Sequence, residues 1–164
     1  MRDKKVLFIV QGAMIAAIYV VLTYFIAAFG LANNAIQVRI SEALTILPVF
    51  TPAAIPGLFI GCLISNLITG CMPLDVVFGS LATLIGACGT YALRKHKWLA
   101  PIPPIVANTI IVPFVLAYVY MFEGGIPYFM LTVGIGEVLS CYVLGMILMT
   151  VLSKYRNVIF PNAK

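Results

Sequence analysis

Two side chains of opposite charge lie close together in one apolar stretch of this chain. Arg39 and Glu42 are three residues apart in the run IQVRISEALTIL, which extends from Ile36 to Leu47. On a helix, residues at i and i+3 share one face, so these two groups can form an ion pair. Two interpretations stay open: a structural pair that stabilises a short helix, or charged groups that line a ligand pocket.

Other polar groups in the apolar segments are candidates for ligand contact. Glu137 lies about 15 Å into the last apolar segment, and Arg39 is the obvious basic partner for it. Asn66 and Asn108 can bridge helices, or can offer the paired donors and acceptors that a planar heterocycle needs. Asp75 lies at the start of an expected helix, where an acid is favoured, so capping is the alternative to ligand contact.

Aromatic side chains gather near the expected ends of three helices. They are Tyr24, Tyr118, Tyr120, Tyr128 and Phe129. Such rings form a belt at a membrane interface, and the same rings turned inward would stack on a flat ligand.

The sequence contains no catalytic or cofactor motif. It has no HExxH, no GxSxG and no glycine-rich phosphate loop, and its one histidine, His96, lies in a basic segment. The four cysteines show no CxxC spacing, and Cys62, Cys88 and Cys141 lie in apolar runs, where cysteine behaves as a small hydrophobic residue. We therefore expect a protein that is not an enzyme, binds no metal or cofactor, and has no ATPase site of its own.

The elements that must position these residues are membrane helices. The 164 residues are 63% hydrophobic and only 9% charged, whereas a soluble domain carries about 25% charged residues. The formal charge is +5, but nine of the ten lysines and arginines fall in three clusters that border apolar segments. This distribution is typical of cytoplasmic membrane flanks rather than of nucleic-acid binding. The clusters are Arg2, Lys4 and Lys5; Arg94, Lys95 and Lys97; Lys154, Arg156 and Lys164.

The basic clusters also determine the expected number of spans. Five apolar segments are long enough to cross a bilayer, and a sixth, 36–50, is short and charged. All three clusters lie in the cytoplasm only if the sixth segment crosses as well. We therefore predict an all-α multi-pass protein of the cell membrane with both termini cytoplasmic and Gly30–Ala35 facing outward. It forms a single domain, residues 1–164, with spans at 6–29, 36–50, 52–69, 74–93, 101–122 and 126–153.

Small residues recur at four-residue spacing on two of the expected helices. The pairs are Gly12 with Ala16, Ala13 with Ala17, and Gly57 with Gly61. This spacing lets helix backbones approach closely, and it leaves open whether the partner is internal or another subunit.

Several long runs resemble one family of membrane transporters. These runs are RISEALTILPVFTPAAIPGLFIGCLISNLI, DVVFGSLATLIGA, WLAPIPPIVANTIIVPF and GEVLSCYVLG. They resemble the QueT family of queuosine-precursor transporters. The resemblance extends from about Gly12 to Gly145. That family belongs to the substrate-binding S-components of energy-coupling-factor (ECF) transporters.

The resemblance implies a small six-helix protein that binds a vitamin-like substrate near the outer face. It implies docking onto an energising module of two ATPases and a transmembrane coupling subunit. Small residues of the first helix, matched here by Ala13 and Ala17, would make that contact. The whole subunit would then topple in the bilayer to deliver its ligand inward.

The substrate implied by the resemblance is a queuosine precursor: a 7-deazaguanine such as queuine or aminomethyl-deazaguanine, or the nucleoside queuosine. A guanine-like edge presents two adjacent N–H donors, which one carboxylate, Glu137 or Glu42, would accept. Asn66 or Asn108 would donate to the carbonyl oxygen, and Asp75 would balance an aminomethyl cation.

Other functions remain open at this stage. An S-component for another heterocyclic vitamin, such as a flavin or folate precursor, would share the fold and differ in pocket chemistry. An intramembrane lipid-modifying enzyme would use Glu42, Asp75 or Glu137 as acid or base, but no nucleophile–base pair or metal constellation supports it. Buried charges disfavour a purely structural subunit without a ligand.

Overall fold

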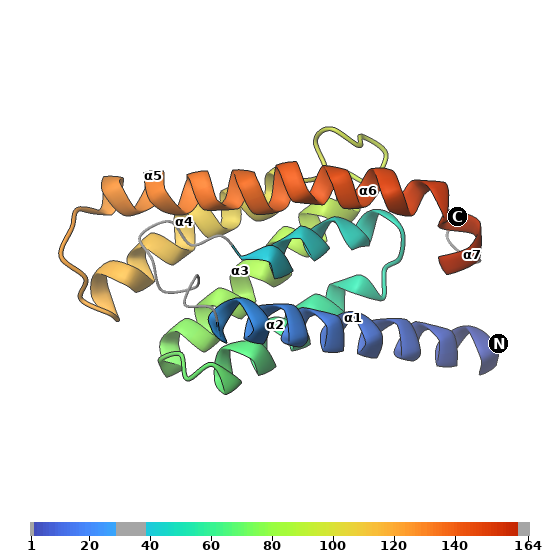
Figure 1. The fold of residues 1–164 in the computed structure, drawn as a ribbon, viewed down its shortest axis with the longest axis horizontal. Helices are drawn as coiled ribbons and strands as arrows, with labels where there is room; N and C mark the ends of the chain where they lie inside the picture. The colour runs from blue at the N-terminus through green and yellow to red at the C-terminus, as the bar shows by residue number, and fades with distance from the viewer. Residues whose placement is uncertain (1, 29–38, 161–164) are drawn as a thin grey trace.

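The computed structural model describes residues 2–28 and 39–160, and every element within them is helical (Figure 1). This confirms the predicted all-α class. The predicted outward segment Gly30–Ala35 and the first residues of the predicted span 36–50 lie outside the described residues. The elements are α1 (Arg2–Ala28), η2 (Ile40–Val49), α2 (Ala54–Ile68), α3 (Pro73–Ala92), α4 (Ile102–Tyr118), α5 (Ile126–Glu137), η3 (Val138–Leu144), α6 (Gly145–Lys154) and α7 (Arg156–Ile159).

Within the part of the chain that the structure describes, three helices are long and apolar enough to cross a membrane, by length and composition. They are Asp3–Ala28, Pro73–Ala92 and Ile126–Lys154, the last of which is formed by α5, η3 and α6 in continuity. The elements η2, α2 and α4 are apolar but shorter, between 10 and 17 residues. A helix perpendicular to the bilayer needs about 20 residues to span the hydrocarbon core.

The second predicted helix differs from an ordinary α-helix. Residues Ile40–Val49 form a 3-10 helix, and eight of its residues are buried. Its extended N-cap residue, Arg39, precedes the helical turns, so Arg39 does not share a helix face with Glu42 as the i, i+3 spacing predicted. The element packs against α1, α3 and α6. This packing stabilises a conformation whose i→i+3 hydrogen bonds are weaker than those of an α-helix.

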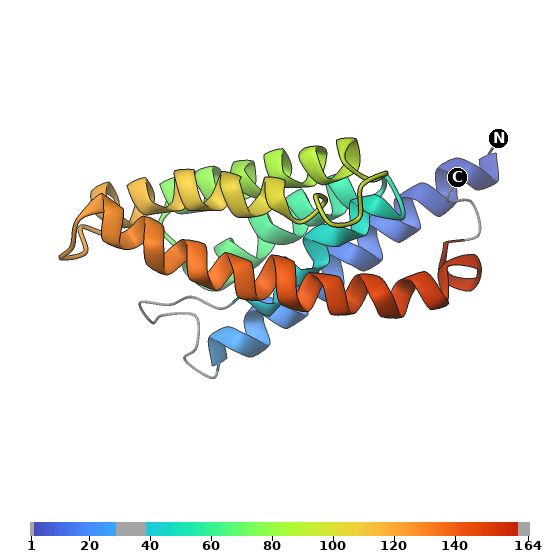
Figure 2. The same cartoon turned by 90° about the horizontal axis from the view of Figure 1, so that it is seen from above.

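The chain ends lie on one side of the bundle. Figures 1 and 2 show the beginning of α1 and the short α7 at one end, and the link between α4 and α5 at the opposite end. The link between α3 and α4, which carries Arg94, Lys95 and Lys97, lies toward the end with the termini (Figure 1).

The small residues of α1 separate into two groups. A Cβ atom at Gly57 would lie 2.7 Å from the carbonyl oxygen of Gly12, and one at Gly61 would lie 3.1 Å from the Cα of Ala16. The α1 and α2 backbones therefore touch through these four residues, which is the geometry that small-residue spacing permits. The residues of the second pair on α1, Ala13 and Ala17, are exposed.

Candidate functional site

A cavity of about 160 Å³ lies at the end of the bundle that is opposite the termini. Its wall is built by the last turns of α1 and α2, the first turn of α3, the end of α4 and the residue that precedes η2. The described residues that line it are Thr23, Ile26, Ala27, Arg39, Ser41, Asn66, Thr69, Cys71, Asp75, Val112, Leu116, Tyr120 and Phe122.

A larger groove, of about 590 Å³, lies between α1 and α6 over η2. Its lining is apolar except for Gln11. It therefore lacks the polar groups that fix the orientation of a heterocycle, and the smaller cavity is the better candidate for a ligand site.

Asp75 forms the polar wall of the cavity at the start of α3. It is 6% exposed, and its Oδ2 accepts a hydrogen bond of 2.8 Å from the hydroxyl of Tyr120. The Tyr120 oxygen in turn accepts from the backbone N–H of Met72 at 3.2 Å. The side chain of Asp75 therefore bonds to the segment that follows α4, and through Tyr120 it is linked to the backbone N–H of Met72, the N-cap residue of α3.

Asn66 lies beside Asp75 because α3 has a glycine between them. A Cβ at Gly79 would lie 3.2 Å from Nδ2 of Asn66 and 3.4 Å from Oδ1 of Asp75. The amide nitrogen of Asn66 also donates to Sγ of Cys62 at 3.6 Å. The missing side chain at Gly79 therefore brings an amide and a carboxylate together on one wall.

Arg39 lies at the cavity within electrostatic reach of two carboxylates. It lines the cavity as the N-cap residue of η2, and its guanidinium lies within electrostatic reach of both Asp75 and Glu42. The backbone carbonyl of Arg39 accepts from the N–H of Glu42 at 2.9 Å. One cation thus faces the carboxylate of the cavity wall and that of the layer beneath it.

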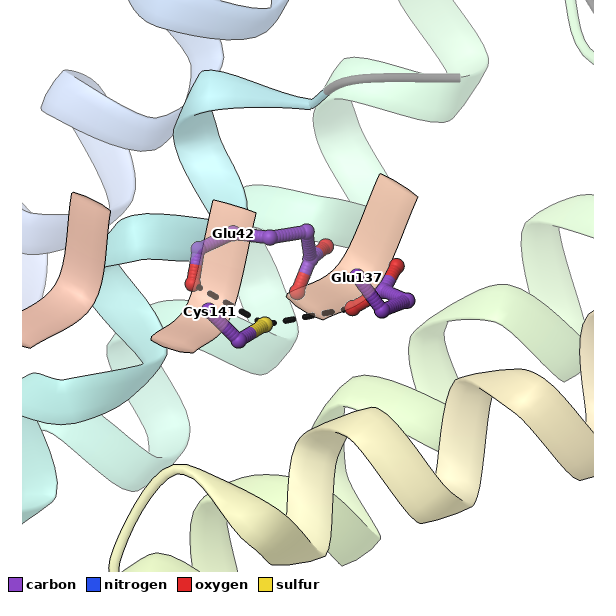
Figure 3. Close-up of side chains that lie close together, drawn as sticks. All are labelled: Glu42, Glu137 and Cys141. Carbon is purple, nitrogen blue, oxygen red and sulfur yellow. Dashed lines mark hydrogen bonds between the residues drawn. The ribbon is translucent and has the colours of Figure 1, made fainter. Parts of the chain in front are cut away.

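Glu42 and Glu137 come together beneath the cavity. Figure 3 shows the two carboxylates near one another, with the thiol of Cys141 beside them. The thiol donates to Oε2 of Glu137 at 3.1 Å and to the backbone carbonyl of Glu42 at 3.6 Å. The three potential ligand atoms lie within 4.8 Å of one another, so sequence positions almost a hundred residues apart form one polar cluster.

The surroundings of Glu42 leave one carboxylate oxygen without a hydrogen-bond partner. Tyr19, which is 1% exposed, donates its hydroxyl to Oε1 of Glu42. Within residues 2–28 and 39–160, Oε2 of Glu42 is buried and has no hydrogen-bond partner. The side chain of Asn108 lies close enough to interact with both Glu42 and Glu137. A buried oxygen without a partner is costly, and a ligand donor would satisfy it.

Helix register places this cluster one turn below the cavity. Tyr19 precedes the cavity residue Thr23 by four positions, and Asn108 precedes Val112 by four. Four residues correspond to about one turn, or about 5.4 Å along the axis. The cluster therefore lies beneath the cavity, buried among α1, η2, α4 and the α5–η3 junction, and is called the floor below.

The π-helical segment η3 begins directly after Glu137 and contains Cys141. Single π-helical turns inside α-helices are frequent at functional sites, because they change the rotation of the following residues. Here the segment packs against η2. This contact positions the Cys141 thiol between Glu137 and the backbone of Glu42.

The six sequence-predicted ligand residues thus occupy two layers. Arg39, Asn66 and Asp75 line the cavity, whereas Glu42, Asn108 and Glu137 lie in its floor. The five aromatic residues near the helix ends differ in exposure. Phe129 is buried and Tyr120 lines the cavity, while Tyr24, Tyr118 and Tyr128 are more than half exposed.

Sequence reasoning missed two members of the floor, Tyr19 and Cys141. A tyrosine in the middle of an apolar helix, far from either interface, was a usable signal, because its hydroxyl needs a partner when it is buried. The cysteine carried no such signal, since its predicted role as a small hydrophobic residue fits most buried cysteines.

The fold and the site define the class of protein: an all-helical, multi-pass membrane protein with a polar site buried in its bundle. The family model described as QueT transporter matches residues 9–154. The chain belongs to the QueT transporter family, which confirms the resemblance seen in the sequence.

One curated relative is the queuosine precursor transporter QueT of Lactococcus lactis subsp. cremoris (strain MG1363). This chain is similar to it at 36% identity over 85 residues. The matched region covers 52% of this chain, and it spans about half, 50%, of the relative's length. No solved structure matches this chain.

Proposed function

We propose that this protein is the substrate-binding S-component of an ECF importer that takes up a queuosine precursor. The observation that carries the proposal is the polar cavity with its carboxylate floor, found in a chain of the QueT transporter family. The ligand class is a 7-deazaguanine base or its nucleoside. The curated relative of similar sequence is named a queuosine precursor transporter, and this supports the same ligand class here.

The chemistry of the site suits a guanine-like edge. Glu137 or Glu42 accepts the ring N–H and the exocyclic amine together, as one carboxylate can accept two parallel hydrogen bonds. Oε2 of Glu42, which is buried and has no hydrogen-bond partner among the described residues, can accept one of these bonds. Asn108 or Asn66 donates to the ring carbonyl, and Arg39 holds the carboxylates of the two layers in place by its charge.

Cavity size favours a small heterocycle over a larger vitamin. Pockets for drug-sized ligands are roughly 300–1,000 Å³, whereas this cavity is about 160 Å³. A bicyclic base is a better match to this volume than its nucleoside, a flavin or a folate.

In the proposed topology six helices cross the membrane and both termini are cytoplasmic. The basic clusters at the start of α1, in the α3–α4 link and after α6 support this orientation, because cytoplasmic flanks are enriched in lysine and arginine. The cavity then opens toward the outer face. The exposed pair Ala13 and Ala17 is the proposed contact with the coupling subunit, and the two separate ATPases drive the toppling that carries the ligand inward.

Thermal unfolding of the purified protein in detergent tests the ligand class. Queuine, aminomethyl-deazaguanine and cyano-deazaguanine are compared with riboflavin and folate. A ligand that binds only the native state adds about 2.7 kcal/mol of stability at a hundredfold excess over its Kd. At least one deazaguanine is expected to stabilise the protein, and a flat response to all of them overturns the proposed substrate.

Two matched variants test the assigned carboxylate. Glu137→Gln keeps the shape of the side chain and loses an acceptor, so deazaguanine affinity is expected to fall about tenfold or more. Glu123→Gln makes the same change at an exposed acid in the α4–α5 link and is expected to leave affinity unchanged. Equal affinities for both variants would remove Glu137 from the proposed site.

A further inference from the structure

The floor brings together three side chains of the types that bind metal ions. A carboxylate oxygen of Glu42, one of Glu137 and the Sγ of Cys141 lie within 4.8 Å of one another, and each residue is at most 6% exposed. They belong to η2, to the end of α5 and to η3. Glu42 and Cys141 are 99 positions apart in the chain, so no local ligand spacing in the sequence could indicate this cluster.

The distances in the cluster suit a small cation between the three groups. Zinc–sulfur bonds are about 2.3 Å and zinc–oxygen bonds about 2.1 Å, so a sulfur and an oxygen at two corners of a tetrahedron lie roughly 3.6 Å apart. The Sγ of Cys141 lies 3.1 Å from Oε2 of Glu137, and the widest separation stays within 4.8 Å. Side-chain shifts of about 1 Å are therefore sufficient for coordination, and no helix has to move.

One oxygen of Glu42 lacks the partner that a buried acceptor needs. Tyr19 donates to Oε1, whereas Oε2 is buried and has no hydrogen-bond partner in the part of the chain that the structure describes. Figure 3 shows the Glu42 carboxylate turned toward Glu137 and the sulfur of Cys141. A buried acceptor without a partner is costly, and a cation at the centre of the cluster removes that cost.

Neighbouring hydroxyl groups hold the three ligands in place. The hydroxyl of Tyr19 fixes Oε1 of Glu42. The hydroxyl of Thr45 lies 3.5 Å from the Sγ of Cys141, where it can donate to a thiolate. Donors of this kind orient the ligands of metal sites and fix their ionised form.

The charges around the cluster also fit a divalent cation. In an apolar interior a carboxyl group or a thiol is stable in its charged form only when a cation compensates it. When Glu42, Glu137 and Cys141 coordinate a divalent cation, any protons that they carry pass to solvent, and one negative charge remains in excess. The guanidinium of Arg39, which also faces Asp75, lies within electrostatic reach of both glutamates and offsets this excess.

The donor atoms decide which cation the cluster prefers. Thiolate favours soft or borderline cations such as Zn²⁺ and Cd²⁺. Magnesium and calcium ions take about six or more oxygen ligands, and here a sulfur replaces one of them. The cavity, with polar lining residues such as Asn66 and Asp75, lies about one helical turn above the cluster and provides the entry path for the ion.

We propose that Glu42, Glu137 and Cys141 form a site for a soft divalent cation of the Zn²⁺ class, and that the bound cation excludes the substrate from the floor. The metal site stands on the cluster itself. The exclusion rests on the proposed function, because the same carboxylate oxygens are assigned there to the edge of the base. A cation that holds these oxygens leaves none of them free to accept the N–H donors, so zinc inhibits substrate binding.

Ultraviolet absorption during titration with Cd²⁺ tests the metal site in the purified protein. A thiolate bound to Cd²⁺ gives a charge-transfer band, which is expected to rise until a single equivalent is bound. The band is expected to be lost in Cys141→Ser, and in Glu137→Gln the cadmium affinity is expected to fall about tenfold or more. The matched control Cys88→Ser removes an exposed cysteine of α3 and is expected to retain the band.

A second measurement needs no variant. X-ray absorption of the zinc-loaded wild-type protein is expected to show sulfur and oxygen ligands together. Absence of the band in the wild type, a band that persists unchanged in a folded Cys141→Ser protein, or a zinc coordination shell without sulfur overturns the metal site. Circular dichroism of each variant in detergent verifies that it is helical and folded.

Isothermal titration with queuine, aminomethyl-deazaguanine and cyano-deazaguanine tests the exclusion. Zn²⁺ at tenfold excess over its own Kd is expected to raise the apparent Kd of the bound deazaguanine about tenfold, while Mg²⁺ at the same concentration leaves it unchanged. Equal deazaguanine affinity with and without Zn²⁺ overturns the exclusion. Binding of no deazaguanine overturns the proposed function together with the exclusion and leaves the metal site standing, whereas loss of the metal site leaves the proposed function standing.

Discussion

The close contact between α1 and α2 predicts the effect of a single methyl group. Gly57→Ala places a Cβ 2.7 Å from the carbonyl oxygen of Gly12, 3.2 Å from its Cα and 3.2 Å from the Cβ of Ile15. Ordinary contacts of a Cβ begin at 3.4 Å. Because the nearest atoms belong to backbone, no rotamer change relieves the overlap, and the two helices must separate by several tenths of an ångström.

The magnitude follows from two opposing effects. Overpacking of a well-packed interior costs about 1–3 kcal/mol, while replacing glycine by alanine within a helix gains about 0.5–1 kcal/mol. The expected net loss is therefore between about 0 and 2.5 kcal/mol of unfolding free energy. The matched control is Gly134→Ala, whose Cβ would lie 3.5 Å from Thr109 in ordinary contact, so only the gain applies.

Unfolding of both variants in a denaturing detergent titration measures the difference. Gly57→Ala is expected to unfold at a lower denaturant fraction than the wild type, and Gly134→Ala at an equal or higher one. If the two variants unfold at the same denaturant fraction, α1 and α2 are not in backbone contact at Gly57. The assignment of Gly12 and Ala16 to the contact with α2, and of Ala13 and Ala17 to the exposed side, is then wrong.

Three further perturbations address the site and the docking surface. Gly79→Ala places a Cβ 3.2 Å from Nδ2 of Asn66, so deazaguanine affinity measured by titration should fall about tenfold; unchanged affinity would separate Asn66 from the ligand. Tyr19→Phe removes the donor to Glu42 and should lower unfolding free energy by about 1–3 kcal/mol in the same detergent titration, whereas full stability would mean that this hydrogen bond is not made. Ala17→Leu adds bulk on the exposed side of α1 and should leave ligand binding intact while cellular uptake of labelled deazaguanine falls about tenfold; normal uptake would exclude this side of α1 as the docking surface.

The polar site could be predicted only in part. The residues Arg39, Glu42, Asp75 and Glu137 stood out because ionisable groups are rare in apolar segments, and all four lie at the cavity or in its floor. Their partners did not stand out. The hydroxyl of Tyr19 and the thiol of Cys141 meet the carboxylates from other helices.

The sequence by itself determined the class, the apolar segments and the family, since hydropathy, charge clusters and distinctive runs are local properties of the chain. The tertiary structure alone decided which small-residue pair of α1 packs inside, that the stretch Ile40–Val49 is a 3-10 helix, and that Glu42 and Glu137 share one floor. These features depend on the rotation and depth of each helix relative to its neighbours. Rotation and depth are set by the packing of the whole bundle, and the spacing of residues along one segment does not encode them.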